Sequence, residues 1–275
     1  MTTPTAPNSP VGCIFCGERS PLSNEHVFRD TLRKHFRSQT GLDLFSESAP
    51  DRTGHLPISM FDRKVKAVCE PCNRGWLNDL DAELEDLLVS LFRADQRRIS
   101  RAELRRLAFW AAVRAAVRGQ TELKATQVAI APYAAQTMKL GLPPEGTTVW
   151  LGLTDIPLTL DGFRHHGMQV VDKEDGSEHA MYHFFQHTVA LNRALFVVVG
   201  SPSLGVGADL ARRLGHGLDL TIQESPVPLA RIWPRPRPLD WPSTPPVPPG
   251  VVATELHNLA VDAIEGGLSE MQDGD

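Results

Sequence analysis

The middle of the chain carries hydrophobic residues at the spacing that amphipathic helices use. Leucines recur every three or four positions from residue 77 to residue 91, with acidic residues between them, which predicts a first helix. Ser100 and Glu103 form a capping box ahead of a long apolar stretch, and Gly119 offers a stop, so we expect a second helix between them. A weaker repeat predicts a third helix over residues 126–140. The central part of the chain is therefore expected to be helical.

Beyond residue 147 the pattern changes to short β-branched or aromatic stretches that turn residues separate. Such stretches predict strands over residues 148–154, 168–172, 181–191 and 194–200. Residues 226–250 hold ten of the 22 prolines, which is incompatible with a helix or a central strand and indicates an extended segment. We therefore expect an α+β protein whose β-rich region follows its helices.

Composition and charge narrow the class of protein. The 275 residues are 41% hydrophobic and 22% charged, which excludes wholesale disorder. The chain has neither the roughly 18 consecutive apolar residues of a membrane helix nor a signal-peptide pattern at its start, so a cytoplasmic protein with no membrane partner is expected. The net charge is −5, but Lys and Arg outnumber Asp and Glu by 20 to 16 over residues 1–140 and are outnumbered by 17 to 8 afterwards. A nucleic-acid contact is therefore expected in the N-terminal half.

The four cysteines form two C-x-x-C pairs, Cys13 with Cys16 and Cys69 with Cys72. Two such pairs in a chain without a secretion signal favour a tetrahedral four-thiolate zinc site over a disulfide framework. A redox pair needs one C-x-x-C only, and it stays open together with plain buried cysteines as the less favoured interpretation. A zinc ion held by four thiolates has no open coordination position, so its expected role is structural.

A second motif lies between and beside the cysteine pairs. Glu25 and His26 stand between the two knuckles, and Asn73 follows Cys72 directly. The motifs therefore follow one another in the order C-x-x-C, Glu-His, C-x-x-C-Asn. With this order, residues 12–90 resemble the zinc-stapled branch of the HNH, or His-Me finger, endonucleases. The resemblance implies a treble-clef or ββα-metal module, in which a β-hairpin and a helix hold a catalytic divalent ion. It also requires an inserted loop between His26 and Cys69, and residues 42–55 are the expected insertion.

The resemblance implies a role for each motif residue. Glu25 and Asn73 would supply oxygen ligands to Mg²⁺ or Mn²⁺, the donors that a hard cation prefers. His26 would be the general base, because an ordinary histidine pKa of about 6.5 suits proton transfer at neutral pH. The implied reaction is hydrolysis of DNA phosphodiester bonds. Basic residues in or beside the module are the expected phosphate contacts: Arg29, Lys64, Lys66 and Arg74.

Two alternatives to a DNA endonuclease stay open at this point: a non-catalytic zinc-finger module that binds DNA, and a nuclease directed at RNA. A homodimer is also left open. Along the chain we expect a disordered lead-in (1–11), the nuclease module (12–92), a helical segment (93–142), a β-rich region of unassigned role that ends in the proline-rich segment (143–250), and a short helix with an acidic tail (251–275).

Three further patterns are weighed against ordinary structural explanations. The second helical region carries eight arginines, among them Arg114 and Arg118, which form either a phosphate-tracking belt or, somewhat more favoured, a solvated face paired with the acidic first helix. His179, His183 and His187 recur every fourth residue, but the neighbouring residues favour a strand, on which they are too far apart to share a metal. Trp233 and Trp241 are expected to anchor the proline-rich segment along a sheet edge rather than to bind a partner.

Overall fold

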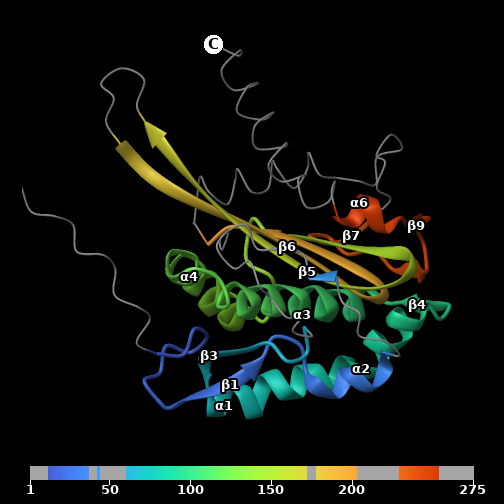
Figure 1. Cartoon of the computed structure of the whole chain (residues 1–275), viewed down its shortest axis with the longest axis horizontal. Helices are drawn as coiled ribbons and strands as arrows, with labels where there is room; N and C mark the ends of the chain where they lie inside the picture. Colours follow the sequence, from blue (N-terminus) through green and yellow to red (C-terminus); the bar gives the residue numbers. More distant parts are fainter. Residues whose placement is uncertain (1–11, 37–41, 44–59, 172–177, 203–228, 254–275) are drawn as a thin grey trace, which may run out of the picture.

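The computed structural model describes residues 12–36, 42–43, 60–171, 178–202 and 229–253. Figure 1 shows three layers: a long β-hairpin with its neighbouring strands, a middle layer that holds α3 (Arg101–Gly119) and α4 (Lys124–Leu140), and a third layer that combines a small hairpin with α2 (Asn78–Arg93). Helices and sheets are both substantial, which confirms the α+β class. The expected lead-in (1–11), the turn at residues 174–176 and the acidic tail after residue 253 lie outside the described residues.

The N-terminal layer is built from two strands and a helix. Strand β1 pairs antiparallel with β3, placing His26 opposite Lys64. A short 3-10 helix, η1, follows β1. The chain then passes from β3 through α1 and the π-helical turn η2 into α2, with a non-helical backbone at Gly75. The bounds are β1 Leu22–His26, η1 Asp30–His35, β3 Lys64–Cys69, α1 Glu70–Cys72, η2 Asn73–Leu77 and α2 Asn78–Arg93.

The three helices predicted between residues 77 and 140 are all present. The first begins at Asn78, one residue after the first leucine of its repeat. In α3 (Arg101–Gly119) the capping box is complete: Ser100 Oγ accepts from the Glu103 N–H at 3.2 Å, and Glu103 Oε2 accepts from the Ser100 N–H at 2.7 Å. The third, α4 (Lys124–Leu140), begins two residues earlier than expected and contains Pro132. None of the helices in the described part of the chain is long and apolar enough to cross a lipid bilayer.

Helix α3 lies in the middle layer, so that from Leu107 onward its side chains are buried on every face. Both interpretations, the phosphate-tracking belt and the solvated face, are therefore wrong for Arg114 and Arg118, which are only 1% and 2% exposed. At Arg106 the expected pairing with the acidic first helix is confirmed, because this side chain pairs with Glu83 of α2.

The β-rich region differs from the four expected short strands. They merge into two long antiparallel strands, β5 (Thr148–Val171) and β6 (Glu178–Gly200), whose register shifts between Leu153 and Leu158. Short strands β2, β7 and β9 add to β5, while β4 pairs with β8. Their bounds, with that of the last helix, are β2 Leu42–Asp43, β4 Arg97–Ile99, β7 Ala230–Trp233, β8 Leu239–Trp241, β9 Pro246–Val247 and α6 Pro249–Ala253. Of the expected insertion at 42–55, only β2 is described.

The proline-rich segment and the histidines behave as their structural explanations predict. Trp233 ends β7 half-buried, and Trp241 ends β8 with 2% of its surface exposed, so both anchor an extended segment. His183 and His187 lie on strand β6 and bond to different partners, His165 and Asp161. His179 also lies on β6, but its side chain is outside the described residues.

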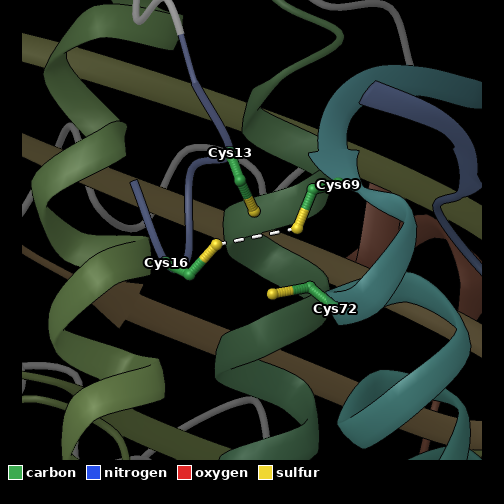
Figure 2. A group of neighbouring side chains, drawn as sticks. All are labelled: Cys13, Cys16, Cys69 and Cys72. Atoms are coloured by element: carbon green, nitrogen blue, oxygen red, sulfur yellow. Dashed lines mark hydrogen bonds between the residues drawn. The ribbon is translucent and has the colours of Figure 1, made fainter. Parts of the chain in front are cut away.

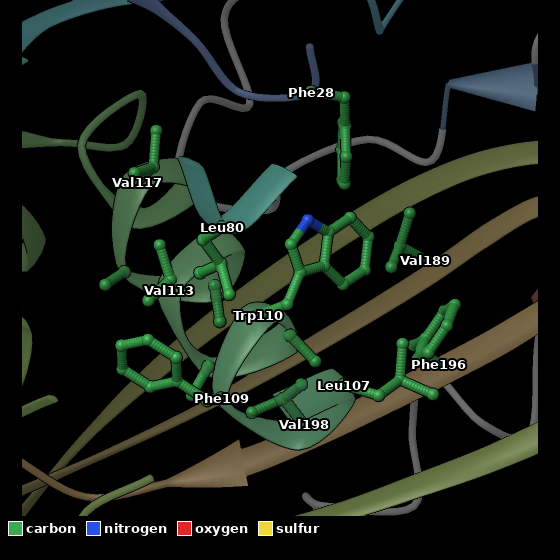
Figure 3. Close-up of a cluster of buried hydrophobic side chains, with 14 of the residues drawn as sticks. Phe28, Leu80, Leu107, Phe109, Trp110, Val113, Val117, Val189, Phe196 and Val198 are labelled. Atoms are coloured by element: carbon green, nitrogen blue, oxygen red, sulfur yellow. The ribbon is translucent and has the colours of Figure 1, made fainter. Parts of the chain in front are cut away.

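One hydrophobic core joins all three layers. Trp110 of α3 is 1% exposed and packs between Phe28, which follows β1, and Phe196 of β6 (Figure 3). Leu80 of α2 and Val189 of β6 belong to the same core. Because the small N-terminal hairpin shares this core with α3, the position of β1 depends on residues far away in the sequence.

Candidate functional site

The four cysteines come together at the base of the small hairpin (Figure 2). Gly17 adopts a φ of +75°, which suits a glycine, and its N–H bonds the Cys13 carbonyl at 2.9 Å to close the first knuckle. Cys69 ends β3 and Cys72 ends α1. All four sulfur atoms lie within 4.8 Å of one another, with 3.6 Å between Cys16 and Cys69. Tetrahedral Zn–S bonds of ~2.3 Å place sulfurs about 3.8 Å apart, so the cluster can hold a metal ion such as zinc.

A cavity of about 180 Å³ opens beside this cluster, between β1, η1 and the start of α2. Glu25, His26 and Asn73, the three residues expected to be catalytic, all line it. Strand pairing and the knuckle explain the convergence: β1 lies against β3, and Asn73 follows the last cysteine of the turn that leaves β3. Polar side chains also make up the remainder of the lining: Asn24, Arg29, Asp30, Thr31, Asn78 and Asp81.

The ring of His26 is oriented by the backbone. Its Nδ1 atom lies 2.9 Å from the carbonyl oxygen of Phe61. A carbonyl can only accept, so Nδ1 carries the proton of the neutral ring and Nε2 carries the lone pair. The unprotonated Nε2 is the atom that a general base requires.

Asn73 is oriented by a chain of two hydrogen bonds. Ser23 donates its hydroxyl proton to the carbonyl oxygen of Val68 at 3.0 Å, so its oxygen accepts from the Asn73 amide nitrogen at 2.9 Å. The nitrogen side of the amide is thereby assigned to Ser23. The carbonyl oxygen of Asn73 is left as the ligand atom on a residue that lines the cavity.

Glu25 is buried, with 6% of its surface exposed, and its partner is Arg114 of α3. Arg114 Nη1 donates to Glu25 Oε1 at 3.1 Å, and to the backbone carbonyls of His26 and Val27 at 3.2 Å each. Arg114 Nη2 donates to both oxygens of Asp81, at 3.0 and 2.9 Å. Burial raises the pKa of Glu25 above its ordinary range, and the charge of Arg114 acts in the opposite direction.

Asp81 and Arg114 were not among the site residues expected from the sequence. Asp81 is one acid among several at the start of α2, and no spacing distinguishes it. The sequence does contain a signal that Arg114 is buried. Arg114 is the single charged residue between Leu107 and Val117, a stretch that is apolar on every face of a helix. Such an arginine is buried and needs acidic partners.

The four expected phosphate contacts lie in different environments, and Arg29 is the one among them that lines the cavity. Arg29 lines the cavity, with Nη1 3.7 Å from a carboxylate oxygen of Glu85. Lys64 and Lys66 are exposed on β3, and Arg74 is exposed after α1 with an ion pair of 2.9 Å to Glu70. Their contact with nucleic acid stays a prediction.

A larger cavity of about 690 Å³ contains none of the expected site residues. It lies at the other end of η1, between Phe36, Phe92 and the irregular part of the hairpin around Asn192. Among the described residues, the four cysteines are the one group of three or more His, Cys, Asp or Glu side chains placed to share a metal ion, which agrees with His183 and His187 having separate partners.

Comparison of the chain with protein-family models, with curated proteins and with solved structures finds no match.

Proposed function

We propose that this protein is a metal-dependent endonuclease of the HNH, or His-Me finger, type that hydrolyses DNA phosphodiester bonds. The convergence of Glu25, His26 and Asn73 on one cavity, with the His26 ring held by the Phe61 carbonyl, is the observation that carries the proposal. Two paired strands followed by a helix, with a cysteine cluster at their base, match what the sequence motif implies.

The donor set of the cavity suits a hard divalent cation. A carboxylate from Glu25 and an amide oxygen from Asn73 are ligands that Mg²⁺ or Mn²⁺ prefers, with water completing the coordination. An ion held there would neutralise the negative charge that develops on the phosphate. Glu25 and Asn73 would hold it from two different elements, the end of β1 and the start of η2.

His26 would act on the attacking water. Its Nε2 accepts the water proton, and the Phe61 carbonyl stabilises the imidazolium that results, because Nδ1–H keeps its acceptor throughout. Arg29 on the cavity wall and Lys64, which pairs opposite His26 on β3, would contact the substrate phosphates.

The cysteine cluster is proposed to hold a structural zinc ion. Asn73 follows Cys72 directly, so a metal on the four thiolates fixes the start of the turn that presents the Asn73 amide. The zinc would thus position a ligand of the cavity without taking part in the reaction.

The test is cleavage of supercoiled plasmid by the purified full chain with Mg²⁺ or Mn²⁺. His26→Ala is expected to lower the rate by roughly 10²–10⁴-fold, the usual contribution of a general base. His35→Ala, a histidine of the same layer that does not line the 180 Å³ cavity, serves as the matched control and should cut normally. Intact plasmid with the wild-type protein, or equal cutting by His26→Ala, contradicts the proposal.

An RNA substrate of the same length, assayed in parallel, separates the DNA nuclease from an RNA-directed one. Tight DNA binding without cutting identifies the non-catalytic zinc-finger module instead.

A further inference from the structure

The guanidinium of Arg114 lies between the strand and the helix that form the candidate cavity. One of its nitrogens bonds Glu25 and two consecutive backbone carbonyls at the end of β1, and the other bonds the Asp81 carboxylate on α2. Arg114 is 1% exposed, so its bonds cannot be exchanged for water without opening the core. One side chain therefore bonds both elements, the Glu25 carboxylate and the backbone carbonyl of His26 on β1 and the Asp81 carboxylate on α2.

Asp81 has a different relation to the cavity from that of Glu25. Both of its oxygens accept from Arg114 Nη2, and Oδ1 also accepts from the Trp110 indole N–H at 2.9 Å. With these bonds Asp81 is a partner of the arginine, although it lies on the cavity wall.

The charges of the three groups explain why a second carboxylate is needed. Glu25 and Arg114 alone sum to zero, and a neutral pair gives a divalent cation little electrostatic attraction. With ionised Asp81 the three groups carry one net negative charge in a buried setting, where charge interactions are weakly screened.

We propose that Arg114 is a positioning residue of the cation site and that Asp81 offsets its charge. Arg114 holds Glu25 and the backbone of His26 in place from α3, outside the small hairpin and its helix. Asp81 keeps the buried group negative enough to bind a divalent cation. This inference rests on the proposed function for the presence of a cation between Glu25 and Asn73, and it adds the two residues that make the site competent.

The test measures Mn²⁺ binding to the zinc-loaded full chain without nucleic acid, by isothermal titration calorimetry or by the electron paramagnetic resonance of free Mn²⁺. Glu25→Gln is expected to abolish the site. Asp81→Asn and Arg114→Lys are each expected to weaken Mn²⁺ binding about tenfold or more, the usual effect of removing a group that orients a metal ligand. Lysine keeps the charge of Arg114 but not the planar fork that reaches both carboxylates.

Arg118→Lys is the matched control. Arg118 is a second buried arginine on the same helix, one turn further on, and it bonds acidic residues that do not line the 180 Å³ cavity. Its conservative replacement disturbs a comparable ion pair, so thermal unfolding is expected to shift as in Arg114→Lys while Mn²⁺ affinity stays within about twofold of wild type. Where Asp81→Asn fails to fold, Trp110→Phe removes one hydrogen bond to Asp81 and should weaken Mn²⁺ binding severalfold.

The outcomes separate this proposal from the nuclease proposal. Wild-type affinity in both Asp81→Asn and Arg114→Lys, with binding lost in Glu25→Gln, overturns the positioning role. A wild-type protein without a Glu25-dependent Mn²⁺ site also overturns it. A Glu25-dependent site that weakens in both variants supports the positioning role even if the protein cuts neither DNA nor RNA, in which case only the nuclease proposal fails.

Discussion

Helix α3 carries two buried arginines one turn apart, and their surroundings differ in net charge. Arg114 bonds Glu25 and Asp81 beside the cavity, whereas Arg118 bonds Glu122 and Asp161 beneath the long hairpin. Arg63 also pairs with Asp161, and His187 Nε2 lies 2.9 Å from its other oxygen. Two arginines and two carboxylates cancel there, while the group at the cavity keeps one negative charge.

The difference in net charge separates a structural group of ion pairs from one that suits the proposed cation site. The group around Asp161 satisfies its charges internally and joins α3 to β5, as a structural cross-link does. The group around Arg114 places two carboxylates on the wall of a cavity and leaves them with one cation between them. Four changes test whether the two groups differ in this way.

Removal of the zinc ion proposed for the four cysteines should have the largest effect. It should act on the small hairpin beside the cavity and not on the long hairpin. Structural zinc contributes about 10–16 kcal/mol of apparent binding free energy in small zinc modules, so a chelator or Cys16→Ser should unfold the small hairpin. Elemental analysis should find about one zinc per chain before treatment, and hydrogen exchange should then show lost protection in β1 and β3 but retained protection in β5 and β6. Equal loss of protection in both regions would mean that the small hairpin and the long hairpin unfold together as one cooperative unit.

Asp161→Asn should lower stability strongly and leave the cavity intact. The change removes the negative charge between Arg118 and Arg63, and breaking a buried ion pair costs about 3–5 kcal/mol. Urea unfolding measures the loss, and Mn²⁺ binding per folded molecule should not change. Weakened Mn²⁺ binding would show that the two groups on α3 are coupled.

Glu25→Gln should have the opposite effects, with little change in stability and a loss of Mn²⁺ binding. Burial raises the pKa of this carboxyl, so a neutral isostere relieves a desolvation cost and still accepts a hydrogen bond from Arg114. We expect a change in the free energy of unfolding within about 1 kcal/mol, measured in urea, together with loss of Mn²⁺ binding and of cleavage. A loss of stability as large as that in Asp161→Asn would assign Glu25 a mainly structural role.

The smallest expected effect is a pH dependence that comes from His187. Burial lowers the pKa of His187 below its ordinary value, so the unfolded chain binds a proton near pH 6.5 that the folded chain does not. Stability should therefore decrease as the pH falls below about 6.5, by at most about 1.4 kcal/mol per pH unit. His187→Gln should flatten this part of the urea-unfolding profile, and an unchanged slope would assign the pH dependence to other groups.

Local chemistry could be predicted wherever a few neighbouring residues decide the outcome. The capping box at Ser100 and Glu103 forms as expected, because both of its hydrogen bonds lie within one helical turn. The spacing of the cysteines predicted a shared cluster, and the four sulfur atoms do lie together. The motif predicted that Glu25, His26 and Asn73 lie close together, and all three line one cavity. The four short strands were wrong in extent, since the irregularity between Leu153 and Leu158 is absorbed within one long strand rather than ending it.

The α+β class, the three helices and the grouping of the four cysteines could be predicted from the sequence, because hydrophobic periodicity, the capping box and the two C-x-x-C pairs are patterns of a few neighbouring residues. The apolar stretch from Leu107 to Val117 already favours burial of α3, but the layers that cover it come from segments distant in the sequence, so its partners depend on the tertiary structure. Once buried, Arg114 and Arg118 need carboxylate partners, and the packing of distant segments supplied Glu25 and Asp81 to one and Asp161 to the other. Arg114 and Arg118, which were expected on the surface with the arginines around them, are thus buried and form ion pairs with acidic residues of β1, α2 and β5.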